Sequence, residues 1–305
     1  MRAKGLVIDV DGVLIHGVAP IAGARECLER IGALGLPHVF VTNGGGVPRQ
    51  DKARSLAKIL GVEAATIAPR LVSAHDPIEA MLEERGLKGQ RVLVLSKSEA
   101  YSRGVAAEWG LADPAVLEDF VAAEPWLFPL CDDGRPLVRD ERRVAAICVV
   151  ATPADWGQSL QLCCDLLLNG GLTHPDEARL PPPPLFVSNP DFDYRARAPL
   201  VRMTTGAWLH ALTALLQHYG AENRYVLAGK PHAPIYSLAR WTLGAPCERV
   251  YCIGDNPEAD IRGAIDNGCV GVLVLTGVAA RDDPRHPADI VAADISAALE
   301  AILKH

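Results

Sequence analysis

The chain predicts an α/β fold built on a doubly wound parallel sheet, and two observations indicate it. Short apolar, β-prone runs alternate with helical patterns along the 305 residues, which is typical of parallel strands joined by crossover helices. Three of these runs also end at polar residues. Residues 6–8 lead into Asp9, residues 38–41 into Thr42, and residues 250–253 into Gly254. Ligands of open α/β sheets bind beyond the carboxyl ends of the strands, so these polar residues should meet in one crevice.

The remaining elements follow in chain order. Helices are expected at 22–34 and 48–60, followed by a third core strand at 91–95. The region that comes next has an α/β pattern of its own, with expected strands at 144–150 and 185–188 and an amphipathic helix at 156–168. The core should resume at 225–227, and 257–268 should form a late helix. The pattern therefore indicates two α/β domains, which agrees with the chain length.

Two aspartates in the first polar cluster suggest phosphoryl chemistry. Asp9 and Asp11 are two residues apart on an extended segment, so their side chains point roughly the same way. One carboxylate can attack phosphorus, while the other protonates the leaving oxygen and later activates water. With Asp255 and Asp260 they form an acidic site that would repel a phosphate unless a hard cation were bound. Oxygen ligands and a phosphate substrate favour Mg²⁺.

Other residues at the strand ends would contact the phosphoryl group. Lys230 supplies a positive charge and the Thr42 hydroxyl supplies a donor. Asn43 follows Thr42, and Gly44 begins a three-glycine run whose backbone amides can approach a phosphate closely. His232, two residues after Lys230, is a candidate substrate contact, although a purely structural role is the more common one for such a histidine. The glycine run lacks the G-x-G-x-x-G pattern of dinucleotide-binding loops.

Four segments together resemble the motifs of the haloacid dehalogenase (HAD) superfamily, in that family's order. They are Asp9–Gly12, Thr42–Gly44, Gly229–Pro231, and Gly254–Asn256 followed by Asp260. Their spacing is similar to subclass IIA, the NagD-like and pyridoxal-phosphatase-like branch. The runs 42–46 and 254–257 also resemble the group related to the cat eye syndrome critical region hydrolase-like protein.

The resemblance implies a role for each motif residue. Asp9 would be the nucleophile, Asp11 the general acid and base, Thr42 a phosphoryl contact, and Lys230 the neutralising cation. Mg²⁺ would be held by Asp9, the Asp11 main-chain carbonyl and Asp255, with support from Asn256 and Asp260. An aspartate at position 11 favours phosphate esters, because the dehalogenase and phosphonatase branches have another residue there.

The resemblance also implies a discontinuous Rossmann-like core, 1–97 and 224–305, with a C2-type cap at 98–223 inserted into it. The cap would select the substrate through the loop after Asp191, and caps of this subclass often mediate homodimers. That loop offers Tyr194, Arg195, Arg197 and Arg202 for an additional anionic or planar group. It is equally consistent with arginines that are solvated or paired with cap acids. In the pyridoxal-phosphatase branch, this loop carries a histidine that contacts the substrate. The present chain has no histidine between Asp191 and Met203, so pyridoxal phosphate is not the preferred substrate.

Composition and charge limit the classes of molecule that the protein is expected to bind. A formal net charge of −7 and the lack of a basic run argue against nucleic acid or a membrane surface. The first strand begins almost at the N-terminus, with no signal-peptide pattern, so we expect a cytoplasmic protein. The eight cysteines include no Cys-x-x-Cys pair and read as buried reduced thiols.

The leading hypothesis is a Mg²⁺-dependent phosphatase that acts on a small phosphorylated metabolite through an aspartyl-phosphate. Two alternatives stay open. A binding or scaffold protein could have kept the fold without catalysis, but the intact set of motif residues argues against this. A phosphotransferase or mutase would use the same residues and differ only in how water is excluded, so the sequence does not separate it from a hydrolase.

Overall fold

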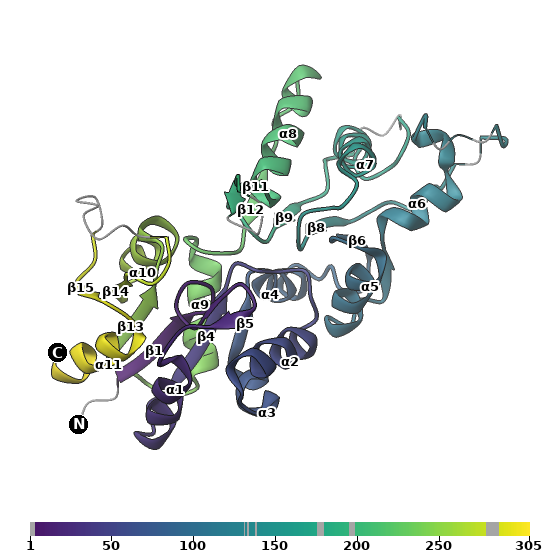
Figure 1. Cartoon of the computed structure of the whole chain (residues 1–305). Helices are drawn as coiled ribbons and strands as arrows, with labels where there is room; N and C mark the ends of the chain where they lie inside the picture. The colour runs from purple at the N-terminus through teal and green to yellow at the C-terminus, as the bar shows by residue number, and fades with distance from the viewer. Residues whose placement is uncertain are drawn as a thin grey trace. The chain divides into compact units, whose positions relative to one another are not determined.

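A computed structural model describes residues 4–130, 132, 134–137, 139–175, 180–194, 199–278 and 287–305. The chain divides into two compact units, coloured along the chain in Figure 1. Unit 1 comprises Met1–Asn43, Arg49–Ala74 and Gly229–His305, and unit 2 comprises Gly44–Pro48 and His75–Ala228. Each unit has a parallel sheet and apolar clusters of its own, which confirms the predicted fold class.

The sheet of unit 1 has six parallel strands. These are β1 (Lys4–Asp9), β4 (His38–Thr42), β5 (Leu71–Ser73), β13 (Arg249–Gly254), β14 (Val270–Val274) and β15 (Ile290–Ala292). Their order across the sheet is β15-β14-β13-β1-β4-β5, so β1 lies between β13 and β4. The central position of β1 explains why its apolar residues are buried on both faces.

Helices cover both faces of this sheet. One face packs against α1 (Ala24–Ala33), α2 (Arg49–Leu60) and α11 (Ile295–Lys304), and the other against α9 (Ala233–Leu243) and α10 (Gly263–Asp266). Strand β1 serves both faces in alternation, since Leu6 and Ile8 join the first cluster and Val7 joins the second. Shorter elements complete the unit: β2 (Ile15–His16), β3 (Ala19–Pro20), α3 (Ala64–Ile67), η1 (Ala68–Arg70) and the π-helical turn η3 (Pro257–Arg262).

Unit 2 repeats the same layered design. Its main sheet is formed by β6 (Arg91–Leu95), β7 (Asp113–Ala115), β8 (Ala146–Val149), β9 (Leu185–Val187) and β12 (Tyr225–Leu227), in the order β12-β9-β8-β6-β7. Helices α4 (Asp76–Glu84) and α5 (Glu99–Glu108) cover one face. Helices α6 (Leu117–Ala123), α7 (Trp156–Leu168) and α8 (Thr205–His218) cover the other. The turn η2 (Pro125–Leu127) and a hairpin of β10 (Asp193–Tyr194) and β11 (Arg202–Met203) complete it.

Two strands that the sequence analysis assigned to the core belong to unit 2. Strand β6 pairs with β7 and β8, and β12 pairs with β9. The next strand of the unit 1 sheet after β4 is instead β5, whose three residues pair with β4. The units divide at 43/44, 48/49, 74/75 and 228/229, whereas the sequence analysis expected domain boundaries at 97/98 and 223/224. Parallel strands buried on both faces have the same apolar pattern in either sheet, so the sequence reveals the strand but not its partner.

Side-chain caps mark where several helices begin. Asp155 precedes α7 and accepts a hydrogen bond from the Gln158 amide at 2.9 Å. Asp294 precedes α11 and accepts one from the Ala297 amide at 2.8 Å. These carboxylates satisfy backbone amides that have no partner within the helix.

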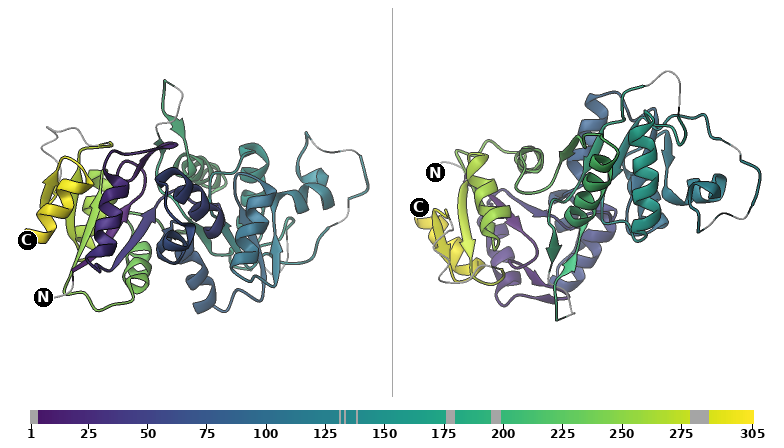
Figure 2. Two further views of the ribbon diagram at one scale, coloured as in Figure 1. Left: turned by 60° about the horizontal axis from the view of Figure 1, so that its bottom comes forward. Right: turned by 90° about the horizontal axis from the view of Figure 1, so that it is seen from above.

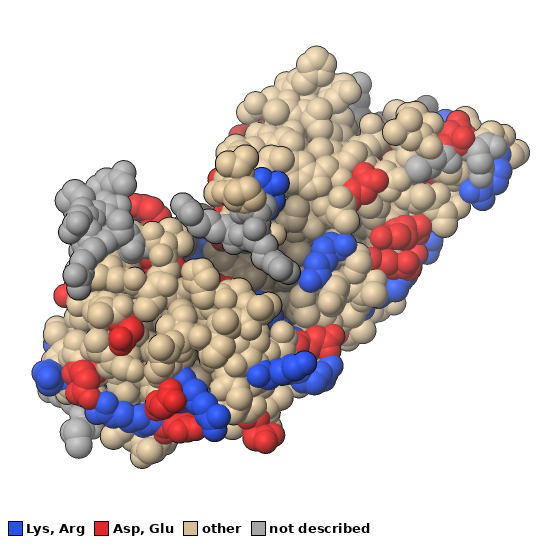
Figure 3. All heavy atoms as spheres, viewed as in Figure 1, with Lys and Arg blue, Asp and Glu red and all other residues tan. Residues whose placement is uncertain are grey.

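The first described strand, β1, and the last helix, α11, lie side by side in unit 1, as both views of Figure 2 show. The Lys4 ammonium on β1 donates a hydrogen bond to the Ile302 carbonyl of α11 at 2.7 Å. On the face drawn in Figure 3, the described basic and acidic side chains are interspersed. Among the helices that the structure describes, none has the length and apolar character needed to cross a bilayer.

The glycine run after Thr42 is packed inside unit 2. The Gly46 amide donates a hydrogen bond to Nδ1 of His75 at 3.2 Å, and the Ser96 hydroxyl donates one to the Gly46 carbonyl at 3.0 Å. A side chain at position 46 would meet Ala151 and Ser96, and one on Gly45 would lie 2.6 Å from the Val150 carbonyl. The sequence analysis expected these amides to approach a phosphate, but the Gly46 amide binds His75.

The packing around Gly46 predicts a difference between two glycine substitutions. Gly46 and Gly86 both have positive φ, 72° and 64°, but nothing lies within 4 Å of the position that a methyl group on Gly86 would take. We expect Gly86→Ala to lower the free energy of unfolding by about 1 kcal/mol through backbone strain alone. Gly46→Ala should lower it by about 2 kcal/mol more, because its methyl group has no space. Urea unfolding of both variants tests this, and equal losses would contradict it.

Candidate active site

Three strand ends bring the predicted catalytic residues to one edge of the unit 1 sheet. Asp9 ends β1, Thr42 ends β4, and Asp255 directly follows β13. The strands are parallel and in close register, since Ile8 pairs with Ile253 and Asp9 pairs with Val41. All three side chains are at least nine-tenths buried. The meeting of strand ends that the sequence predicts is therefore present in the structure.

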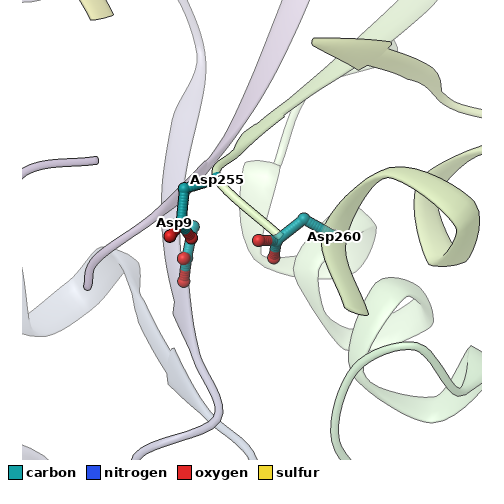
Figure 4. A group of neighbouring side chains, drawn as sticks. All are labelled: Asp9, Asp255 and Asp260. Atoms are coloured by element: carbon teal, nitrogen blue, oxygen red, sulfur yellow. The ribbon is translucent and has the colours of Figure 1, made fainter. Parts of the chain in front are cut away.

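Lys230 lies between two of the acids. Its ammonium group is 2.6 Å from Oδ1 of Asp9 and 2.5 Å from Oδ1 of Asp260. Lys230 is 5% exposed, so both ion pairs are shielded from water. One cation thus joins β1 to η3. The side chains of the three acids Asp9, Asp255 and Asp260 converge on one another (Figure 4).

Backbone fixes Asp255 from two sides. The Val278 amide donates a hydrogen bond to Asp255 Oδ2 at 2.7 Å. A side chain on either Gly12 or Gly277 would collide with the Asp255 carboxylate. The carboxylate therefore occupies a space that exists only because both positions are glycine. Gly12 has a φ of 83°, which favours glycine independently. The Thr276 hydroxyl then holds the nucleophile loop by donating to the Gly12 carbonyl at 2.5 Å.

Asp260 is held by groups of the protein itself. One oxygen accepts from Lys230, and the other accepts from the Asn256 amide at 3.0 Å. The Asn256 side-chain oxygen accepts from the Glu258 and Ala259 amides at 3.0 and 3.1 Å, so it caps η3. These contacts suit the supporting roles predicted for Asp260 and Asn256.

The side chains of Asp11 and Thr42 contact one another. The Thr42 hydroxyl donates to Asp11 Oδ2 at 3.4 Å, and Asp11 is exposed whereas Asp9 is buried. An exposed acid beside a buried one suits exchange of protons with substrate and water.

Two further predicted contacts, Asn43 and His232, lie in unit 1. The Asn43 side chain binds the backbone of Lys230 through two hydrogen bonds. His232 is half-buried directly before α9, and burial lowers the pKa of its imidazole.

The remaining predicted contacts lie in unit 2 or outside the described residues. Gly44 begins the packed glycine loop. Tyr194 and Arg202 are exposed and face one another in register on the β10–β11 hairpin. The Arg202 Nε donates to the carbonyls of Leu200 and Val201, within its own loop. Arg195 and Arg197 lie outside the described residues.

Sequence reasoning missed two supports of the site. The Tyr236 hydroxyl on α9 donates a hydrogen bond to the Ala259 carbonyl at 2.9 Å, and it lies 3.2 Å from the Asp260 carbonyl oxygen. These two contacts fasten η3 to α9. The loop 276–278 holds Asp255 and Gly12. A threonine-glycine pair directly after the apolar run 270–275 was a signal for this loop, because it repeats the pattern of polar residues at a strand end. Tyr236 has no such signal.

Burial and mutual repulsion set the protonation of the acids. Burial is the largest cause that raises the pKa of Asp9, and Asp260 adds to it, while Lys230 acts in the opposite direction. Burial and then Asp260 raise the pKa of Asp255 to about 6. Burial alone would lower the pKa of Lys230, but Asp260 and Asp9 outweigh it and raise that pKa well above its ordinary value. Lys230 is therefore a permanent cation.

The acids fit a divalent metal ion. Asp9, Asp255 and Asp260 each offer a carboxylate oxygen, and these atoms lie within 4.8 Å of one another. When ionised, three carboxylates and one ammonium leave two negative charges in a buried space, which a doubly charged cation would neutralise. Donors that are all oxygen favour Mg²⁺ over a transition metal.

Comparison with known proteins identifies the class of this fold and site. A family model described as haloacid dehalogenase-like hydrolase matches residues 6–110, and a second, HAD-hydrolase-like model matches residues 227–298. Together they span more than half of the chain and include every motif of the site. The chain belongs to the haloacid dehalogenase-like hydrolases, and within them it is similar to NagD-like members.

Individual relatives agree with this assignment. The chain is 28% identical to a Schizosaccharomyces pombe cardiolipin synthase (CMP-forming)/mitochondrial hydrolase fusion protein, over 94% of the chain but only 50% of that protein. It is 24% identical to the ribonucleotide monophosphatase NagD of Escherichia coli, over 93% of the chain and 92% of NagD. The crystal structure of a Mycobacterium tuberculosis glycerol phosphate phosphatase in complex with magnesium has the same fold. Its TM-score is 0.70 at 20% identity, covering 97% of this chain and 76% of that one.

The raised pKa of Asp255 predicts how the metal-free protein responds to pH. A carboxyl with a higher pKa in the folded state contributes stability at low pH, and this contribution is lost as the pH rises through about 6. The rise from the ordinary 3.8 to about 6 corresponds to about 3 kcal/mol. In EDTA, the free energy of unfolding of the wild type relative to Asp255→Asn should fall by that amount between about pH 4 and about pH 7. Parallel pH profiles of the two proteins would contradict the assignment.

Proposed function

We propose that the protein is a Mg²⁺-dependent phosphatase that hydrolyses a small phosphorylated metabolite through an aspartyl-phosphate on Asp9. The observation that carries this proposal is the position of Asp9 at the carboxyl end of β1. There, its carboxylate is 2.6 Å from the Lys230 ammonium and next to Asp255 and Asp260. Asp11 and Thr42, whose side chains contact one another, complete the group of reacting residues.

The chain's own residues supply each step of the reaction. The Asp9 carboxylate attacks phosphorus, and Asp11 gives a proton to the leaving oxygen. Asp11 then takes a proton from water, which attacks the phosphorus of the aspartyl-phosphate and releases Asp9. The Thr42 hydroxyl, which donates to Asp11 here, would turn to donate to a phosphoryl oxygen.

Charge compensation makes these steps feasible in a buried site. Lys230 favours the ionised form of Asp9, against the burial that raises the pKa of this group. Asp9, Asp255 and the Asp11 main-chain carbonyl would hold Mg²⁺, with Asp260 and Asn256 in support. When bound, Mg²⁺ would neutralise the acids and stabilise negative charge on the transferring phosphoryl group.

The substrate class follows from the core chemistry and from the names of relatives. A ribonucleotide monophosphatase and a glycerol phosphate phosphatase both act on small phosphate monoesters, which supports a substrate of that class. We also place the chain in subclass IIA and, within it, in the group related to the cat eye syndrome critical region hydrolase-like protein, on the basis of its 42–46 and 254–257 segments. A cytoplasmic location and a homodimer through the cap remain our predictions; one fungal relative is named a mitochondrial hydrolase.

A substrate screen tests the proposal directly. We would measure phosphate release from p-nitrophenyl phosphate and a panel that includes nucleoside monophosphates and glycerol phosphate, with Mg²⁺ and with EDTA. Release that requires Mg²⁺ would establish a phosphatase and rank its substrates. Silence with Mg²⁺ still bound would favour a phosphotransferase that lacks its acceptor, or a protein that only binds.

The nucleophile is tested by Asp9→Asn. An amide does not attack phosphorus as a carboxylate does, so turnover should fall at least about a thousandfold with the fold retained. Asp266→Asn is the matched control, because Asp266 is an acid on α10 that has no part in the site. Substantial turnover by Asp9→Asn, or an equal loss in the control, would remove Asp9 from this role.

Substrate selection by the cap is tested by Arg202→Ala. If the β10–β11 loop binds the organic part of the substrate, KM for the best metabolite should rise about tenfold while KM for p-nitrophenyl phosphate stays the same. Arg224→Ala is the control, since Arg224 is an exposed arginine of unit 2 that pairs with Glu222. Equal changes for both substrates would exclude Arg202 from specificity.

A further inference from the structure

The Asn43 side chain forms a closed pair of hydrogen bonds with one backbone residue. Its Nδ2 donates to the Lys230 carbonyl at 3.0 Å, and the Lys230 amide donates to its Oδ1 at 2.9 Å. Only one orientation of the side-chain amide satisfies both bonds, because the backbone amide donates and the carbonyl accepts. The pair therefore fixes both the Asn43 side chain and the backbone of Lys230.

This pair joins two parts of unit 1 that are distant in the sequence. Asn43 follows the phosphoryl-binding Thr42, and 187 positions separate it from Lys230. Asn43 ends the first of the three chain segments that form unit 1, and Lys230 is the second residue of the last segment, which begins at Gly229. The amide pair therefore fastens the end of the first segment to the start of the last.

A fixed backbone matters for Lys230 more than for most lysines. The lysine side chain is long and flexible, and holding it in one geometry costs conformational entropy. Here its ammonium must lie within hydrogen-bonding distance of both Asp9 and Asp260, at 2.6 and 2.5 Å. A displaced backbone would lengthen one of these contacts, and small misplacements of catalytic groups have large effects on rate.

We propose that Asn43 is a positioning residue that acts through Lys230, and that its side chain serves this lysine and not the substrate. The inference rests on the proposed phosphatase function for its consequence in catalysis, but the placement of Lys230 can be measured independently. The sequence analysis assigned Asn43 to substrate binding. The two bonds to Lys230 give its side chain a different task.

A double-mutant cycle on Mg²⁺-loaded enzyme tests the proposal, with p-nitrophenyl phosphate as the substrate. We expect Asn43→Ala to lower kcat about tenfold to a hundredfold with a smaller effect on KM. In the Lys230→Ala background, the same change should cost less than about twofold, because the residue through which Asn43 acts is gone. Losses that simply multiply would overturn the proposal and make Asn43 an independent contact.

A second readout does not depend on activity. Lys230 is buried and paired, so it should react slowly with an amine-acetylating reagent, followed by mass spectrometry. Asn43→Ala should speed acetylation of Lys230 at least about fivefold as the ion pairs loosen. Unchanged labelling would overturn the inference even if the wild type releases no phosphate. Absence of phosphate release with faster labelling would instead contradict only the proposed function.

One control variant and one alternative variant complete the experiment. Asn169→Ala is the matched control, because Asn169 Nδ2 donates to the Asp165 carbonyl at 2.9 Å at the end of α7 in unit 2. It should change neither kcat nor the labelling of Lys230, and an equal effect there would refute a specific role of Asn43. If Asn43→Ala fails to fold, Asn43→Asp keeps the shape and the acceptor, but it replaces the donor with a carboxylate oxygen that carries negative charge and cannot donate to the Lys230 carbonyl. The same cycle and labelling then apply, with effects of the same direction.

Discussion

The site depends on one buried cation held between two buried acids. Asp9 and Asp260 come from separate segments, and each would be costly to bury in ionised form without a partner. The Lys230 ammonium pairs with both at once. When all the acids are ionised, this arrangement leaves a surplus of negative charge beside Asp255, which a divalent cation would neutralise.

The rest of unit 1 is arranged so that this pairing holds. The parallel sheet brings Asp9 and Asp255 to one edge, while Tyr236 fixes the η3 turn that carries Asp260. Asn43 fixes the backbone of the lysine itself. Hydrogen bonds from the protein backbone therefore set the positions of the charged groups before any ligand binds, which is the preorganisation that electrostatic catalysis requires.

Much of the site could be predicted from the sequence, because its residues follow apolar strand patterns in a fixed order. Asp9, Thr42 and Asp255 lie at strand ends as predicted. Which of the two sheets each strand joins was harder to predict from the sequence. Strand β6 has the pattern of a buried parallel strand in either sheet, and β5, the true neighbour of β4, is only three residues long. Supports such as Tyr236 act through backbone carbonyls, and nothing in the residue type reveals such a partner.

The two glycines that contact Asp255, Gly12 and Gly277, have a consequence for comparing related chains. Positions 12 and 277 have no room for a side chain, because the Asp255 carboxylate occupies the space where one would begin. A paralogue could therefore retain every acidic residue of the site and still be unable to place this carboxylate if either glycine were replaced. When active members of such a family are separated from silent ones, these two glycines are as informative as the acids themselves.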